Sequence, residues 1–178
     1  FFLRRKDPAK AAETIVELVS QRLPRNMGIQ PEQIQVLSPT RKTAAGTAAL
    51  HRALQEAANP EAQGTGVRRL AAFTFREGHR VMQGRHHYAL PRQDRDSLPS
   101  GMGVFNGDIG QIVEVDNRNQ LITVDFDGRL VEYEPDMLGE LEPAYAITVH
   151  KAQGSEYRAV ILSVSKGAPM LLTRGVLY

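Results

Sequence analysis

Residues 144–157, AYAITVHKAQGSEY, carry the clearest structural signal in this sequence. An apolar run through Val149 is followed at once by polar residues, which is typical of a buried strand that leads into a helix. Several of these residues can form hydrogen bonds at the junction: Thr148, His150, Lys151 and Gln153. Ligands commonly bind where the strands of an α/β sheet end. The junction is therefore a candidate functional site.

Two interpretations of this junction follow from the residues alone. His150 and Gln153 are three positions apart and share a helix face, so they can contact one ligand or cap one another in a turn. Gly154 permits a sharp turn, and Glu156 can accept a hydrogen bond from a hydroxyl group. Spacing alone favours the structural role, in which the two side chains cap each other.

The rest of the two ends of the chain alternates strands with helices. Asp7-Pro8 starts a helix, because Asp caps free amides and Pro suits the first helical position. Apolar residues then recur at helical spacing until Pro24, which we expect to end the helix. We expect a second helix over Thr47–Ala58 and strands over 1–5, 34–37, 144–149 and 158–165. This order argues for an α/β domain with a parallel sheet.

A different pattern begins after Glu61. Short alternating segments separated by turns predict strands over 70–75, 80–83, 110–115, 120–126 and 129–133. Asp127-Gly128 between the last two is a strong hairpin signal. We interpret this region as a small antiparallel β-barrel inserted into the α/β domain, which divides the chain into residues 1–70, 71–142 and 143–178.

Charge is segregated along the chain. Lys and Arg number 16 against 9 Asp and Glu in residues 1–107, 2 against 10 in residues 108–142, and 4 against 1 in residues 143–178. Basic stretches can neutralise phosphates, whereas the acidic segment should repel a nucleic-acid backbone. Charge alone favours the interpretation that both stretches are solvated faces, and it suggests a partner without identifying one.

Several classes of protein and site are excluded by composition. The chain has no cysteine, so disulfides, Cys-based zinc sites and thiol catalysis are absent. No apolar run approaches the roughly 18 residues of a membrane span, and no signal peptide is recognisable. The neighbouring His86 and His87 lack a third ligand, so we predict no metal site. We expect a cytoplasmic protein with no membrane partner.

The segment 144–156 resembles motif V of superfamily 1 DNA helicases, specifically the RecD-like group (exodeoxyribonuclease V alpha-subunit and TraA-like proteins). Other segments are similar to parts of that family in the same order. They are 36–42 with 54–60 (motif IV region), 78–83 with 104–110 (lead into an SH3-like insertion) and 171–178 (entry to motif VI). The resemblance implies an incomplete RecA-like domain of the P-loop NTPase type, the second of two motor domains, with an inserted SH3-like β-barrel.

The resemblance also implies site residues. For ATP these are Arg41, which would reach the phosphates, Glu156, which would accept a hydrogen bond from the sugar, and Gly154, which shapes the turn. For single-stranded DNA they are Thr148, His150, Lys151, Gln153 and Asn106. Three alternatives stay open: Arg41 as an exposed loop residue, Lys151 as a solvated residue, and Asn106 as part of a turn with Gly107, which we favour.

The function implied is ATP-dependent DNA unwinding, in the 5′→3′ direction, with ATP and Mg as cofactors. The implied partners are single-stranded DNA, the first RecA-like domain of the parent protein, and RecB- or RecC-like subunits. However, the sequence contains no G-x-x-x-x-G-K-[ST] phosphate loop and no magnesium-binding Asp-Glu pair, and the motif VI arginine would lie just beyond Tyr178. We therefore expect the parent to be the enzyme and this chain alone to be inactive, with the Mg ligands outside it.

Three departures from the family pattern fall in the insertion. His79 stands where Asp is usual, Arg85-His86-His87-Tyr88 replaces an Arg-Asn pair, and the 15 residues between Tyr88 and Val104 form a longer stretch than usual. An alternative function comes from the acidic segment 108–142. It predicts a non-enzymatic interaction module whose barrel binds a basic protein partner.

Overall fold

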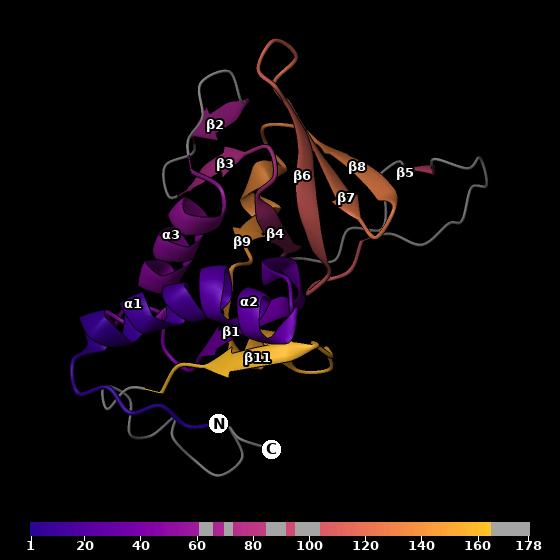
Figure 1. Ribbon diagram of the computed structural model, residues 1–178. Helices are drawn as coiled ribbons and strands as arrows, with labels where there is room; N and C mark the ends of the chain where they lie inside the picture. Colours follow the sequence, from indigo (N-terminus) through magenta and orange to yellow (C-terminus); the bar gives the residue numbers. More distant parts are fainter. Residues whose placement is uncertain (61–65, 70–72, 85–91, 95–103, 165–178) are drawn as a thin grey trace. The chain divides into compact units, whose positions relative to one another are not determined.

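The computed structural model describes residues 1–60, 66–69, 73–84, 92–94 and 104–164. The chain divides into two compact units, and the second is inserted into the first along the sequence (Figure 1). The first unit comprises Phe1–Pro60 and Tyr145–Tyr178, and the second comprises Glu61–Ala144. The corresponding divisions predicted from the sequence fall after residues 70 and 142.

The first unit contains the parallel sheet that the sequence predicted. Its strand order is β10 (Ala146–Thr148), β1 (Ile34–Ser38) and β11 (Ala159–Leu162), and β1 pairs in parallel with both neighbours. The register places Ser38 beside Thr148 and Ile34 beside Ala159. All three strands therefore end at the same edge of the sheet.

Two helices accompany this sheet: α3 (Thr47–Ala58) packs against β10, and α1 (Pro8–Glu17) packs against α3. Asp7 caps α1 as expected, since its carboxylate accepts the N–H of Ala9 at 2.9 Å. Leu50 and Leu54 of α3 are buried, as their helical spacing predicted. The helices and strands share one apolar core, formed by Ile15, Val19, Ile29, Ile34, Val36, Leu50, Leu54 and Ala146.

Two expectations for the amino-terminal region are wrong. Phe1–Arg5 is not a strand. Pro24 does not stop the first helix, because α1 continues through a π-helical turn (Leu18–Arg22) into α2 (Leu23–Met27). In the π turn the N–H of Leu23 bonds five residues back to Leu18, and Pro24 then occupies the first turn of α2, where its missing N–H is tolerated. Gly28, with φ +63°, ends the helix instead.

The second unit is built from antiparallel strands. β2 (Val67–Arg69) and β3 (Thr74–Arg76) form a two-stranded ribbon. Of the strand predicted over 70–75, residues 74 and 75 lie in β3, and residues 70–72 lie outside the described residues. A six-stranded sheet has the order β5-β8-β7-β6-β4-β9. Its strands are β4 (Arg80–Gln83), β5 (Arg92–Asp94), β6 (Ile109–Asp116), β7 (Leu121–Phe126), β8 (Arg129–Tyr133) and β9 (Leu141–Pro143).

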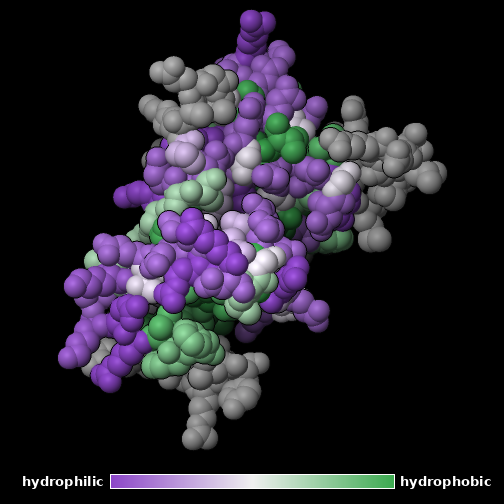
Figure 2. Space-filling view, viewed as in Figure 1, coloured by the Kyte–Doolittle hydropathy of each residue, from purple (hydrophilic) through white to green (hydrophobic). Residues whose placement is uncertain are grey.

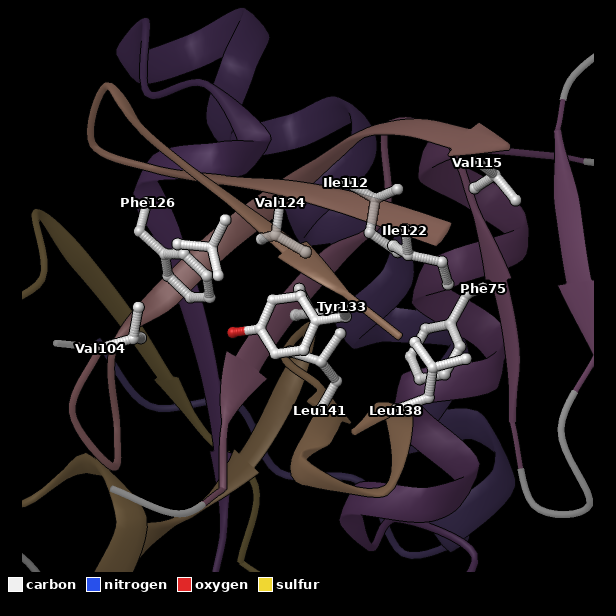
Figure 3. Packing of buried hydrophobic residues seen from close by; sticks show 12 residues of the cluster. Phe75, Val104, Ile112, Val115, Ile122, Val124, Phe126, Tyr133, Leu138 and Leu141 are labelled. Carbon is white, nitrogen blue, oxygen red and sulfur yellow. The ribbon is translucent and has the colours of Figure 1, made fainter. Parts of the chain in front are cut away.

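One apolar core serves nearly all of these strands. Figure 3 shows side chains from β3, β6, β7, β8 and β9 pointing toward one another, with Tyr133 and Phe126 at ring centroids 6.5 Å apart. Because β8 and β9, which lie far apart in the strand order, both contribute to this cluster, the sheet curls around it as a barrel does. Three single-turn 3-10 helices complete the described elements: η2 (Pro31–Gln33), η3 (Leu138–Glu140) and η4 (Val149–Ala152).

The hairpin predicted at Asp127-Gly128 is confirmed. Both residues have positive φ, +53° and +85°, as a type I′ turn requires, and Asp125 accepts the N–H of Gly128 at 2.6 Å. At the opposite end of β7, Asp116 accepts the backbone N–H groups of Arg118 and Asn119 at 2.8 and 3.1 Å. The tip of the β6–β7 hairpin is hydrophilic (Figure 2).

In the first unit, Figure 2 shows hydrophobic surface over β11, where Val160 is 49% exposed.

Candidate functional site

The two predicted groups of the first unit start from neighbouring strands at one sheet edge. The loop Pro39–Gly46, called here the Arg41 loop, follows β1, and the segment 148–156 follows β10. Ser38 and Thr148, the last residues of these strands, lie in register, and η4 contacts β1. The strands' carboxyl edge is where α/β sheets usually bind ligands, so the structure brings both groups to a suitable place.

The segment after β10 is a single 3-10 turn, tighter than the helix the sequence suggested. Thr148 enters the turn with extended backbone, and the N–H of Gln153 meets the carbonyl of His150 at 3.4 Å. The side chains of His150 and Gln153 are exposed, and neither has a hydrogen-bond partner among the residues described. The mutual side-chain cap is therefore not formed there, and both side chains are available to a ligand.

Gly154 turns the chain back toward β11. Its φ of +82° is in the left-handed region, and a Cβ there would meet nothing within 4 Å, so glycine is favoured by conformation and not by space. Ser155 closes the turn by donating its N–H to Ala152 at 3.1 Å. The carboxylate of Glu156 is exposed and has no partner in the described part of the chain. Lys151, by contrast, is half-buried and not fully solvated.

The Arg41 loop carries two exposed cationic side chains, Arg41 and Lys42. Its backbone is held by hydrogen bonds from the start of α3. The first amides of α3 donate back into the loop, from Thr47 to the Thr40 carbonyl at 3.0 Å and from Ala48 to the Arg41 carbonyl at 3.2 Å. These bonds satisfy N–H groups that a helix start would otherwise leave free. They also fix the backbone from which the Arg41 side chain projects.

Hydroxyl groups hold the same loop against the sheet. Ser38 and Ser163 both donate to the carbonyl of Ala45, at 3.3 and 3.0 Å, and the hydroxyls of Thr40 and Thr43 are 2.8 Å apart. This network was not predicted from the sequence. A clustering of Ser and Thr just after β1 was the available signal, but Ser163 lies 118 positions from Ala45 and only the fold brings them together.

Asn106 belongs to the second unit and is exposed in a four-residue turn. Asp108 donates its N–H to the carbonyl of Phe105 at 3.0 Å and accepts the N–H of Phe105 at 3.0 Å. Gly107 has φ +99°, and a type II turn requires a positive φ at its third position. The geometry thus contains the turn that the sequence favoured for Asn106.

His79 has a structural environment. It is 2% exposed, and its Nδ1 accepts the backbone N–H of Arg76 at 3.1 Å. Burial, aided by the positive charge of Arg76, lowers the pKa of His79 to about 4. Of the other departures from the family pattern, His86, His87 and the stretch 89–103 apart from Arg92–Asp94 of β5 lie outside the described residues, as does the segment 171–178.

The described ranges contain neither a metal-binding cluster nor a membrane-spanning helix. No group of three or more His, Asp or Glu side chains there could hold a metal ion. Within the same residues, no helix combines the length and apolar character needed to cross a bilayer.

Comparison with known proteins identifies two helicase segments. Residues 50–126 match the family model of the ATP-dependent RecD-like DNA helicase SH3 domain, and residues 143–178 match the UvrD-like helicase C-terminal domain. The ATP-dependent RecD2 DNA helicase of Deinococcus radiodurans is 34% identical over 148 residues, 83% of this chain and 18% of that protein. The RecBCD enzyme subunit RecD of Mycobacterium tuberculosis is 32% identical over 78 residues, 44% of this chain and 13% of that subunit.

Solved structures support the same fold. Pif1 helicase from Bacteroides in complex with ADP-AlF3 and single-stranded DNA superposes with a TM-score of 0.52 at 18% identity, over 93% of this chain and 45% of that one. Bacteroides Pif1 bound to single-stranded DNA gives a TM-score of 0.50 at 18% identity, with the same coverage. These helicases share the RecA-like α/β fold, and the matched SH3 segment accounts for the inserted barrel. The chain spans less than a fifth of the curated relatives it matches.

Proposed function

Because the chain belongs to the RecD-like superfamily 1 DNA helicases, we propose that it serves as the second motor domain of an ATP-dependent DNA helicase. We assign residues 1–70 and 143–178 to this motor domain and 71–142 to its inserted barrel. One observation carries the proposal. Ser38 and Thr148 end adjacent parallel strands in register, so the Arg41 loop and the segment 148–156 leave from the same sheet edge.

The proposed nucleotide contacts are Arg41, Gly154 and Glu156. The Arg41 guanidinium is exposed on a braced loop and suits phosphate oxygens at any working pH. Glu156 offers an exposed carboxylate that can accept a hydrogen bond from the nucleotide sugar, after the turn that Gly154 forms. ATP therefore fits the residues present. Mg²⁺ fits no cluster of the described residues, and we assign its ligands to the rest of the parent protein.

The proposed DNA contacts are Thr148, His150, Lys151 and Gln153. The side chains of His150 and Gln153 are exposed and have no hydrogen-bond partner in the described ranges, so they can form hydrogen bonds to a DNA strand that crosses the sheet edge. Such contacts are indifferent to base sequence when they reach sugar and phosphate, and they weaken with salt. Asn106 is proposed to contribute from the barrel, in addition to its role in the turn.

In this function, two RecA-like domains close on ATP and reopen after hydrolysis. Each cycle moves the contacts of His150 and Gln153 along the DNA strand. We propose 5′→3′ movement in the cytoplasm, with the first RecA-like domain, and RecB- or RecC-like subunits where present, as partners. Phosphoryl transfer depends on positioned cations around the phosphates. Since this chain contains no phosphate loop, we propose that it does not hydrolyse ATP alone.

The test uses the intact parent protein. Arg41→Ala should raise the KM for ATP in DNA-stimulated hydrolysis, whereas Lys42→Ala, next in the same loop, is the matched control. The double variant His150→Ala, Gln153→Ala should weaken binding of single-stranded DNA at low salt, with Ser155→Ala as its control. Wild-type ATP KM in the first variant, or equal DNA affinity in the second, removes the corresponding assignment.

A second candidate function rests on the outer face of the barrel. The register of β6, β7 and β8 places the exposed Glu114 and Glu132 on either side of Thr123. Together with the net charge of residues 108–142, this face suits a basic protein partner. Titration with a Lys/Arg-rich peptide tests it. Unchanged affinity after Asp125, Asp127, Glu132 and Glu134 are replaced by Lys would exclude this docking role.

A further inference from the structure

We infer that Ser163 is a positioning residue for Arg41, because its hydroxyl ties the Arg41 loop to the end of β11. The inference rests on the proposed contact between Arg41 and ATP. Ser163 belongs to none of the motifs identified in the sequence and is not one of the residues proposed to contact ATP or DNA.

Ser163 makes two hydrogen bonds in different directions. Its backbone N–H donates to the carbonyl of Leu37 in β1 at 2.8 Å, which extends the pairing of β1 and β11 by one step. Its hydroxyl donates to the carbonyl of Ala45 in the Arg41 loop at 3.0 Å. Ser163 is 6% exposed and Ala45 is 2% exposed, so water competes little for either bond. Ser163 therefore links the sheet to the loop directly.

Ala45 receives a second, longer bond from Ser38 at 3.3 Å. A carbonyl oxygen has two lone pairs and can accept both hydroxyls. The two serines come from the ends of β1 and β11, so the loop is anchored to two adjacent strands at once. Removal of the shorter bond should loosen the loop without releasing it.

The hydrogen bond to Ala45 affects the position of Arg41 because the backbone of the Arg41 loop is connected by internal contacts. The Arg41 carbonyl is held from the helix side by the N–H of Ala48 at 3.2 Å. A Cβ on Gly46 would lie 2.8 Å from the Arg41 oxygen and 2.9 Å from the Thr43 nitrogen, so the two limbs of the loop touch. A shift of Ala45 is thus passed to Arg41. Displacements of about 1 Å at a positioning group are enough to weaken its contact with a reacting substrate.

The test measures DNA-stimulated ATP hydrolysis by the intact parent protein at saturating single-stranded DNA. Ser163→Ala should raise the KM for ATP by about five-fold, the size expected for one hydrogen bond, with kcat within about two-fold. Ser163→Thr retains the hydroxyl and should restore the KM. In the double variant Arg41→Ala, Ser163→Ala, the KM should equal that of Arg41→Ala, because both changes remove one interaction.

The outcomes separate the inference from the proposed function. If Arg41→Ala leaves the KM unchanged, the nucleotide role of Arg41 itself fails. If Arg41→Ala raises the KM while Ser163→Ala does not, or if the two effects multiply, the positioning role is overturned. Should Ser163→Ala not fold, Ser163→Cys, which keeps the volume but donates weakly, replaces it, and a wild-type KM then overturns the inference.

Discussion

The phenol of Tyr133 donates to Oε1 of Gln83 at 2.8 Å, although the two residues are 50 positions apart. The amide of Gln83 in turn donates to the carboxylate of Glu140 at 3.0 Å. Tyr133 and Gln83 are both fully buried, so this chain of hydrogen bonds lies inside the barrel. Burial, with the nearby charges of Glu140 and Asp108, raises the pKa of Tyr133, which keeps the phenol protonated as a donor.

Tyr133→Phe should lower the free energy of unfolding by about 1–3 kcal/mol, because the buried Oε1 of Gln83 loses its donor. Urea denaturation followed by circular dichroism measures the change. Tyr157→Phe is the matched control, since the buried hydroxyl of Tyr157 has no hydrogen-bond partner among the described residues. Equal stability losses in the two variants would contradict the proposed weight of the Tyr133–Gln83 bond.

Stability should fall between pH 6.5 and pH 4 through His79. The folded protein holds this imidazole neutral, with a pKa of about 4, whereas the unfolded chain takes up a proton near pH 6.5. The unfolded state therefore binds more protons in this window, and acidification destabilises the fold by up to about 3 kcal/mol. The contribution is fully present above pH 6.5.

Denaturation curves at pH 7, 5.5 and 4.5 for wild type and His79→Asn measure this effect. The wild type should lose more stability than the variant as the pH falls, since other groups titrate equally in both. His150→Ala, at an exposed site, should follow the wild type. Parallel pH profiles for wild type and His79→Asn would show that His79 does not control the acid sensitivity.

Gly110→Ala should destabilise the barrel by about 1–3 kcal/mol, the usual cost of overpacking. A Cβ at Gly110 would lie 2.7 Å from the Asp125 carbonyl and 2.7 Å from Cγ1 of Val124. Gly139→Ala is a close control, because a Cβ there meets nothing within 4 Å. Thermal unfolding of both variants tests the prediction, and a similar midpoint for the pair would refute it.

Gly46→Ala should disturb the Arg41 loop, since the three atoms nearest to the new Cβ are backbone atoms of Arg41 and Thr43 at 2.8–2.9 Å. In the parent protein we expect a higher KM for ATP and an unchanged affinity for single-stranded DNA. Ala44→Ser adds one atom at an exposed position of the same loop and serves as control. A loss of DNA affinity equal to the change in KM would point to general unfolding of the motor domain.

Local patterns predicted most of the secondary structure. The helix Thr47–Ala58, the strand pair on either side of Asp127-Gly128 and the parallel sheet are found where periodicity and turn residues placed them. The helix and the hairpin depend on residues close in sequence, whereas the parallel sheet was inferred from the order of strands and helices along the chain. The π turn before Pro24 was not predictable in this way, because it arises from how the whole helix accommodates the proline.

The candidate site was predictable only in outline. The resemblance indicated His150, Gln153 and Arg41, and the fold supplied their shared sheet edge. The bond from Ser163 to Ala45 could not be predicted, because only the tertiary structure brings the two residues together. The burial of His79 could not be predicted either, because its neighbours in the sequence do not indicate a buried position. A buried histidine and a surface histidine have the same appearance in a sequence.

The pairing of β4 with β9 has a consequence for the order of folding. β1 must find β10 across 110 residues of chain, counted from Ser38 to Thr148. Val81 of β4 lies beside Pro143 of β9, so an already folded barrel shortens the effective loop to about 48 residues. That saves about 0.7 kcal/mol of loop-closure entropy. A barrel that folds first therefore speeds the pairing of β1 with β10. Variants that slow folding of the barrel should delay assembly of the parallel sheet.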